Sequence, residues 1–463
     1  MPNPPPEITS RFDAANPSYA SYPTADRFVG AFTAEQVSQA LAQRQHQVAA
    51  MVLPLSVYVR VAFCKSVCHH CAGSASNSLS HARSQTYLRY LAREADLHTR
   101  YLGTGQRICQ LHLGGASLTM LCDDELRELM NMLHYGFNFA PDGEYTVEVD
   151  PRTVTASQLN TLAGLGFNRL TFDVQDVDPA VQQGVHCVHR VQPVEQLLSL
   201  VQSARLFGFE SVNVKIMFGL PQQTPESFDR TLDQTTGLQP DRIALYAFTH
   251  LHQQFKSQRR IVLTELPSEG ERHLMLSRSL LAFQKAGYVH VGMDYFALPA
   301  DSLAIAKRQG RLHRNFLGYS AQPDCDLISL GVSAVGRIGA IYSQNAQTLD
   351  AYYNCLDQGR LPVKRGLALT RDDLVRRSVI MALICQGQLE FESIDLAHLI
   401  DFKSYFSAEL TLLQDMQAEG LVEVSDTNLQ ITAIGWHFAR SVTAVFDRYL
   451  QADHTRKKFS RII

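Results

Sequence analysis

Strand-like apolar runs alternate with segments of helical length through the first half of the chain. The apolar runs are Leu55–Phe63, Ile108–Leu113, Tyr145–Val149, Leu170–Val174, Val212–Phe218 and Ile243–Phe248. The helix-length segments between them are Gln85–Tyr101, Asp123–Tyr135, Thr155–Leu165, Pro193–Phe207 and Pro225–Thr236. Because neighbouring parallel strands need a crossover connection, usually a helix, the alternation predicts an α/β fold built from parallel βα units. The functional side chains of such a sheet are expected at the carboxyl ends of its strands.

The segments on either side of these βα units have a different character. Residues 1–50 read as an N-terminal arm that contains the loop Tyr19–Thr24. Thr370 is a typical helix cap, and acidic residues follow it in the first turn. A second helix is predicted at Phe406–Glu419 and a hairpin at 420–432. We therefore expect an arm (1–50), a βα core (51–300), a connecting segment that covers the substrate (301–364) and a small, mainly helical C-terminal domain with the hairpin (365–463).

Composition and charge narrow the possible partners. The chain has 463 residues, a formal net charge of −3 and 19% charged residues, which is typical of a globular protein and does not favour binding to nucleic acids. The first residues lack the basic-then-apolar pattern of a secretion signal, and no run reaches the about 18 apolar residues of a membrane span. A cytoplasmic location, with no membrane partner, is expected.

Three cysteines lie within eight residues, directly after the first predicted strand. Cys64, Cys68 and Cys71 have C-x3-C-x2-C spacing, so a loop at the end of that strand can bring three thiolates to one inorganic centre. Three protein ligands are one fewer than the four that close a Cys-ligated iron–sulfur cluster, which would leave one iron open to another ligand. The spacing predicts such a cluster.

A structural zinc site is the main alternative from spacing alone, because His69 or His70 could complete a site with three cysteines and one histidine. Disulfides are not expected, since the nine cysteines are odd in number and no secretion signal is visible. The remaining cysteines are interpreted as small core residues; they are Cys109, Cys122, Cys187, Cys325, Cys355 and Cys385.

An ordered series of motifs extends from the arm to the end of the chain. The motifs are Tyr19–Thr24, Tyr58 with the three cysteines, Gly114-Gly115, Glu148–Arg152, Phe167–Leu170, Val174–Asp176, Gly219–Glu226, Gly292–Phe296, Leu312–Phe316, Gly331–Ala334, Ala368–Leu374 and Phe459–Ile463. Together they resemble the oxygen-independent coproporphyrinogen III oxidases, which are radical S-adenosylmethionine (SAM) enzymes. The resemblance covers nearly the whole chain, and several motifs outside the cysteine region belong to this family in particular.

The resemblance implies a fold, a reaction and cofactors. The fold would be a partial (β/α)6-type radical SAM barrel with an N-terminal arm and a small, mainly helical C-terminal domain. A [4Fe-4S] cluster would reduce SAM to a 5′-deoxyadenosyl radical that takes a hydrogen from the propionate β-carbon of coproporphyrinogen III. Loss of carbon dioxide and one electron, in two rounds, would give protoporphyrinogen IX in haem biosynthesis. Two SAM molecules, an electron donor for the cluster and a monomer are expected.

The resemblance also assigns cofactor-binding positions, although it assigns no catalytic residue. Cys64, Cys68 and Cys71 match the cluster ligands. Glu148 matches a carboxylate suited to the SAM ammonium or a ribose hydroxyl, and Gln175 matches an amide that can donate and accept. The other positions implied to bind cofactor are Tyr58, His70, Gly115, Ala116, Ser117, Arg190, Lys215, Thr249 and Val335.

Several positions depart from the family pattern. The sequence differs at Arg60, Ala62, His70, Gly73, Ala116, Asp173 and Lys215. Asp173 stands where the family has a glycine, and Lys215 where it has an aspartate expected to bind SAM, so an aspartate at 215 is expected to tighten SAM binding. A three-residue insertion precedes Arg190, and if it shifts the loop, Cys187 would face the site instead. An alternative function is therefore a divergent paralogue that keeps fold and cluster without this turnover and binds haem or tetrapyrrole as a chaperone or sensor.

Overall fold

The computed structural model describes residues 8, 12, 21–46, 53–63, 81–115, 118, 121–185, 191–253 and 255–453. The chain divides into two compact units, each drawn from segments far apart in the sequence. Unit 1 combines Met1–Arg27, Val289–Pro323 and Leu369–Ile463, and unit 2 combines Phe28–Tyr288 and Asp324–Ala368. Among the helices of the described ranges, none has both the length and the hydrophobicity that a membrane crossing requires.

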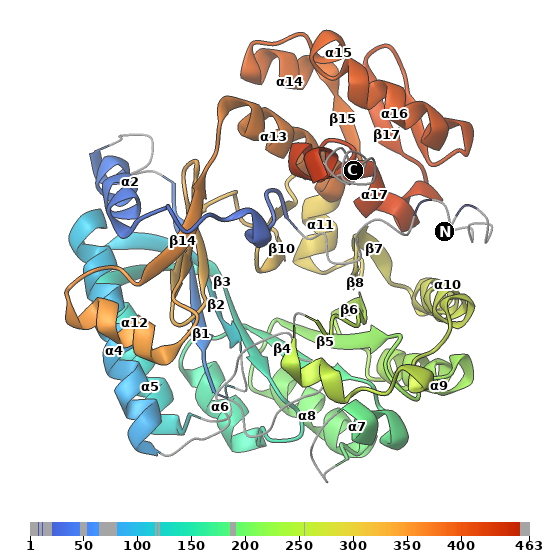
Figure 1. Ribbon diagram of the computed structural model, residues 1–463. Helices are drawn as coiled ribbons and strands as arrows, with labels where there is room; N and C mark the ends of the chain where they lie inside the picture. The colour runs from blue at the N-terminus through green and yellow to red at the C-terminus, as the bar shows by residue number, and fades with distance from the viewer. Residues whose placement is uncertain are drawn as a thin grey trace. The chain divides into compact units, whose positions relative to one another are not determined.

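Unit 2 is built on a curved sheet whose first six strands run parallel to their neighbours. These strands are β1 (Leu55–Val61), β2 (Gln106–Gly115), β3 (Phe137–Val149), β4 (Arg169–Gln175), β5 (Ser211–Phe218) and β6 (Arg242–Ala247). The connecting helices, which follow the outer face of the sheet in Figure 1, are α4 (His81–Leu102), α5 (Asp123–Gly136), α6 (Ala156–Gly164), α7 (Pro179–Val185), α8 (Val194–Leu206) and α9 (Pro225–Gly237). The predicted strands and helices of this region are confirmed, and α7 is an addition.

Local sequence signals explain where several of these helices begin. The Thr155 hydroxyl accepts a hydrogen bond from the Gln158 amide and caps α6. Thr224 caps α9 in the same way, and Pro225 follows at the first helical position, where its missing N–H and fixed φ are tolerated.

The sheet of unit 2 continues on the other side of β1. Its order is β14-β13-β12-β11-β1-β2-β3-β4-β5-β6, with β11 (Asp326–Leu330) parallel to β1. The next three strands, β12 (Val335–Ile338), β13 (Ile341–Asn345) and β14 (Val363–Ala368), are antiparallel, and α12 (Leu349–Asp357) lies between the last two. These strands were not predicted from the sequence, and pairing with β11 makes β1 an internal strand of the sheet. The other elements of unit 2 are α2 (Ala34–His46), η4 (Lys256–Arg260), η5 (Leu263–Glu265) and α10 (Glu269–Lys285).

Unit 1 includes Leu369–Ile463, which is most of the segment 365–463 that the sequence predicted to form a C-terminal domain. Thr370 caps α13 (Arg371–Gln386), as expected, and the predicted hairpin is formed by β16 (Val422–Val424) and β17 (Asn428–Ile431). The Tyr22 hydroxyl of the arm donates a hydrogen bond to Asp373 of α13 at 2.8 Å. The other elements are η2 (Ala25–Arg27), β7 (Val289–Gly292), β8 (Tyr295–Ala297), α11 (Ser302–Arg308), β9 (His313–Asn315), β10 (Gly318–Ser320), β15 (Gln388–Glu390), α14 (Phe391–His398), α15 (Phe402–Tyr405), α16 (Ser407–Ala418), η6 (Gly435–Phe438) and α17 (Ala439–Ala444).

The cysteines interpreted as core residues are buried to different degrees. Cys109, Cys325 and Cys385 are buried, Cys122 and Cys355 are half-buried, and none of these five cysteines forms a disulfide. Cys187 lies outside the described residues.

The buried carboxyl group of Glu94 connects α4 to the segment between the end of β11 and α12 through hydrogen bonds. Glu94 is completely buried and accepts hydrogen bonds from the Gly331 amide at 2.7 Å, the Asn345 side chain at 2.6 Å and the Tyr352 hydroxyl at 2.5 Å. Burial raises the pKa of Glu94 to about 8, although the three donors favour the charged form. The folded protein therefore holds this carboxyl protonated at neutral pH.

Glu94→Gln should flatten the pH dependence of stability between about pH 4.5 and about 8. In this window the unfolded chain loses the Glu94 proton while the folded chain keeps it, so the free energy of unfolding falls as pH rises, by up to about 1.4 kcal/mol per pH unit. The check is denaturant unfolding at a series of pH values. Glu128→Gln, at an exposed position, is the control, and parallel curves for the wild type and Glu94→Gln would contradict the prediction.

Candidate functional site

Alternating side chains along the strands of unit 2 create a polar face. On β1, Val57, Val59 and Val61 are buried, whereas Tyr58 and Arg60 between them are half-buried. Successive side chains of a strand point to opposite faces, so the half-buried residues share one face of the sheet.

A carboxylate lies between two basic side chains on this face. Lys215 of β5 forms an ion pair with Glu148 of β3, and the Nε2 atom of His112 on β2 lies 3.3 Å from the same Glu148 oxygen. The three side chains keep between 15% and 24% of their surface exposed. We refer to Glu148, Lys215 and His112 as the charged triad.

The charge of Glu148 is set by its neighbours. Burial alone would raise the pKa of Glu148, but the Lys215 ammonium and the hydrogen bond from His112 outweigh it and hold the pKa below its usual range. Glu148 is therefore ionised at neutral pH, and Lys215 is its principal counter-charge.

Asp173 and Gln175 lie beside the triad on β4. Asp173 is in register with Lys215 across the β4–β5 pair. Burial, helped by the nearby Glu148 carboxylate, raises the pKa of Asp173 above its usual range, and Lys215 and a hydrogen bond from the Gln175 side chain only partly offset this. Gln175 adopts a left-handed backbone with φ of 65°, and its buried Oε1 atom has no hydrogen-bond partner among the described residues. A strained backbone and an unsatisfied buried acceptor are costly, and together they favour a ligand-binding role.

Two glycines at the end of β2 keep space beside the triad. A Cβ atom on Gly114 would lie 2.8 Å from the His112 ring and 3.1 Å from Glu148. Gly115 has φ of 105°, and a Cβ atom there would lie 2.7 Å from Arg60 and 3.3 Å from the Tyr58 hydroxyl. Only glycine fits here without displacing these side chains, and its backbone can be approached closely by a ligand.

The structure thus brings together five of the residues that the sequence predicted to bind cofactor, namely Tyr58, Gly115, Glu148, Gln175 and Lys215. The Tyr58 ring packs against His112 with centroids 5.6 Å apart. Gly115 lies beside Tyr58, Lys215 pairs with Glu148, and Gln175 is hydrogen-bonded to Asp173. Thr249, just after β6, and Val335, the first residue of β12, are half-buried, and among the described residues no hydrogen bond or ion pair joins them to the triad.

The other predicted site residues lie outside the described residues. They are the cluster ligands Cys64, Cys68 and Cys71, the cofactor positions His70, Ala116, Ser117 and Arg190, and the alternative Cys187. Within the described ranges, no group of three or more Cys, His, Asp or Glu side chains could hold a metal ion.

Sequence reasoning missed His112 and treated Asp173 only as a departure from a family pattern. His112 occupies the position two before Gly114, so strand alternation places it on the same face as that glycine. Counting the period of β2 back from the glycine-rich turn would have found it. The pairing of Asp173 with Lys215 depends on the register between two strands.

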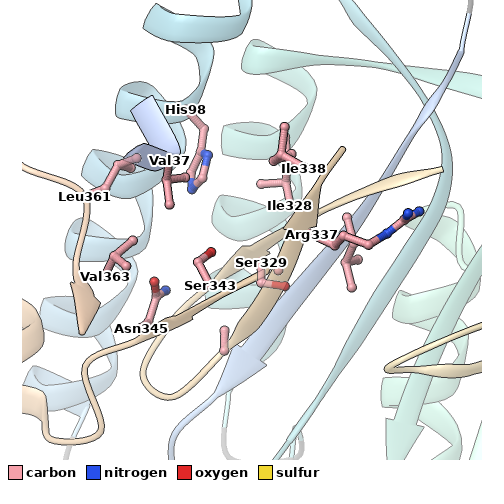
Figure 2. Close-up of a pocket in the computed structure, with 13 residues that line it drawn as sticks. Val37, His98, Ile328, Ser329, Arg337, Ile338, Ser343, Asn345, Leu361 and Val363 are labelled. Atoms are coloured by element: carbon pink, nitrogen blue, oxygen red, sulfur yellow. The ribbon is translucent and has the colours of Figure 1, made fainter. Parts of the chain in front are cut away.

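A separate pocket lies between α2, α4 and the strands β11–β14 (Figure 2). It is lined largely by apolar side chains and contains the buried His98, whose Nδ1 atom has no partner among the described residues. Burial lowers the pKa of His98 to about 4, so the ring is neutral at physiological pH. None of the residues predicted to bind cofactor belongs to the lining of this pocket.

Comparison with known proteins identifies the family. The Radical SAM superfamily model matches residues 58–235, and the HemN C-terminal domain model matches residues 369–438. An oxygen-independent coproporphyrinogen III oxidase of Pseudomonas aeruginosa is 41% identical over 462 residues, which cover 99% of this chain and 98% of the relative. The chain belongs to the oxygen-independent coproporphyrinogen III oxidase family.

Other members of the family agree in sequence and structure. The oxygen-independent coproporphyrinogen III oxidase of Escherichia coli is 38% identical over 456 residues, 98% of each protein. The solved structure of coproporphyrinogen III oxidase (HemN) from Escherichia coli, a radical SAM enzyme, matches with a TM-score of 0.88 and covers 93% of this chain and 97% of that one. The predicted fold, a radical SAM α/β barrel with a helical C-terminal region, is confirmed.

Lys215→Met should destabilise the protein at neutral pH, because it leaves the Glu148 carboxylate without its principal counter-charge. We expect a loss below the about 3–5 kcal/mol of a fully buried pair, since both side chains remain partly exposed. The loss should shrink as the pH falls through the usual range of a glutamate, where the unfolded chain takes up the proton that ionised Glu148 resists.

The measurement is denaturant unfolding of the cluster-free protein at neutral and acidic pH. Lys285→Met, at an exposed position of α10, controls for the loss of a lysine. Equal stability of Lys215→Met and Lys285→Met at neutral pH would refute the assigned role of the ion pair.

Proposed function

We propose that this protein catalyses the oxygen-independent oxidative decarboxylation of coproporphyrinogen III to protoporphyrinogen IX. The observation that carries the proposal is similarity along nearly the whole chain to oxidases of this name, including the C-terminal domain. The alternative of a haem-binding chaperone or sensor is not favoured by any of these comparisons.

The proposed cofactors are a [4Fe-4S] cluster and SAM. Cys64, Cys68 and Cys71 would hold the cluster, and three thiolates would leave one iron open for SAM. When bound, the two cofactors supply an electron and a group that removes hydrogen from the propionate side chain of the substrate. An electron donor for the cluster is also required, and we propose that the protein acts as a cytoplasmic monomer.

The described residues beside the triad fit SAM in three respects. The unsatisfied Gln175 Oε1 atom can accept a hydrogen bond from an amino or hydroxyl group of the ligand. Gly114 and Gly115 allow close approach to the backbone. Tyr58 and His112 supply ring surfaces on the same face. The sequence adds His70, Ala116, Ser117, Arg190, Thr249 and Val335 as further proposed contacts.

The residues around the cofactor site would position and shield it. The ion pair with Lys215 fixes the Glu148 carboxylate in its ionised form, and so sets the charge that a ligand meets. The half-buried side chains leave little water around these groups, which strengthens charge–charge interactions relative to bulk water.

The test is turnover by anaerobically reconstituted protein. With reductant and SAM, addition of coproporphyrinogen III should stimulate formation of 5′-deoxyadenosine and yield protoporphyrinogen IX, detected by chromatography after oxidation to the porphyrin. Cys64→Ala, Cys68→Ala and Cys71→Ala should each lose the thiolate–iron absorption together with both products.

Cys355→Ala is the matched control, because it removes a half-buried cysteine outside the C-x3-C-x2-C motif. A protein that binds coproporphyrinogen III and carries the cluster, yet forms no porphyrin product with any reductant tried, would contradict the proposed function.

A further inference from the structure

We propose that Asp173 supplies the SAM-binding carboxylate in this protein and that Lys215 is a positioning residue that holds Glu148. The inference rests on the proposed function, because it assigns residues to its cofactor. It explains two departures from the family pattern as one exchange, in which the acidic residue has moved from β5 to β4 and a lysine has taken its former position.

The register of the sheet allows this exchange. Asp173 and Lys215 are partners across the parallel β4–β5 pair, so both side chains lie on the same face, one strand spacing of about 4.8 Å apart. A carboxylate at 173 therefore lies about one strand spacing from where an aspartate at 215 would place it. Asp173, which stands where the family has a glycine, therefore keeps a carboxylate at this edge of the site.

The ion pair explains why the lysine does not cancel the new carboxylate. Lys215 reaches Glu148 of β3 and forms its ion pair there. Lys215 acts on Asp173 through its charge, but among the described residues no ion-pair contact reaches Asp173, and its hydrogen-bond partner is the Gln175 side chain. Asp173 thus retains acceptor capacity toward a ligand.

Two acceptors then lie side by side on β4. They are the Asp173 carboxylate and the Oε1 atom of Gln175, which is buried and unsatisfied within the described part of the chain. Adjacent acceptors fit a ligand group that offers several donors. SAM has two such groups, the α-ammonium of its methionine moiety and the hydroxyl pair of its ribose.

The exchange also revises the expectation for position 215. In Lys215→Asp alone, Glu148 would lose its counter-charge and three carboxylates would share one face. Mutual repulsion would then disfavour their ionised forms. An aspartate at 215 should therefore help only when Asp173 is removed at the same time.

The experiment is equilibrium dialysis of SAM against reconstituted protein carrying Asp173→Asn, Asp173→Gly, Lys215→Asp or the double change Asp173→Gly/Lys215→Asp. Asp173→Asn keeps the size of the side chain and removes its charge, and it should weaken SAM binding about 10- to 150-fold, as expected for loss of a charge-assisted contact. Both other single variants should also bind SAM weakly. The double variant should recover to within about threefold of the wild type, which a purely structural role of either residue would not produce.

Thermal unfolding and iron content identify variants that fail to fold or to hold the cluster. If Lys215→Asp fails in this way, Asp173→Asn decides alone. Wild-type affinity in Asp173→Asn, or a double variant no better than the product of its single effects, would overturn the inference.

A second ligand identifies the group that Asp173 contacts. 5′-Methylthioadenosine keeps the ribose hydroxyls and lacks the ammonium, so Asp173→Asn should weaken its binding only if the hydroxyl pair is the partner. Failure of the proposed function has a different signature. If the four variants bind SAM as expected but the wild type forms no porphyrin product, coproporphyrinogen III is rejected as the substrate. If Asp173→Asn turns over with an unchanged KM for SAM, only the role of Asp173 is rejected.

Discussion

The ion pair between Glu148 and Lys215 is the interaction on which the candidate site depends. A carboxylate in a largely buried position is costly unless a counter-charge lies beside it. Among the described residues, Lys215 is the cation nearest to Glu148. With that charge balanced, His112 can lie against the same oxygen, and the backbone at Gly114 and Gly115 can pass close to both side chains. The polar face of the sheet is thus organised around one neutralised carboxylate.

The regular part of the fold was predictable because its signals are local. Each parallel strand is an apolar run long enough to be recognised, and each crossover helix has its own start signal, such as Thr155 or Thr224. The end of each strand then indicates one edge of the sheet. The resemblance to the oxidase family assigned Tyr58, Gly115, Glu148 and Gln175 to one site, and the strand pattern placed them on neighbouring parallel strands.

The parts that were missed depend on information that no single segment carries. The strands β12 and β13 are short and mix polar residues with apolar ones, as in Val335–Ile338, so their period gives little signal. The relation between Asp173 and Lys215 follows from strand register, which is fixed by packing across the sheet. The substitution at 215 therefore looked like an isolated reversal of charge until its partner on the next strand was known.

The position of β11 has a consequence for how the chain folds during synthesis. The strand β1, which leads to the three cysteines, is hydrogen-bonded on one side by β2 and on the other by β11. It ends at Val61, whereas β11 begins only at Asp326, so one edge of β1 stays open while most of the chain is still being translated. Open strand edges can pair with other chains, and contacts between distant segments form slowly. We expect the nascent protein to depend on protection of this edge by the ribosome or by chaperones until β11 has emerged.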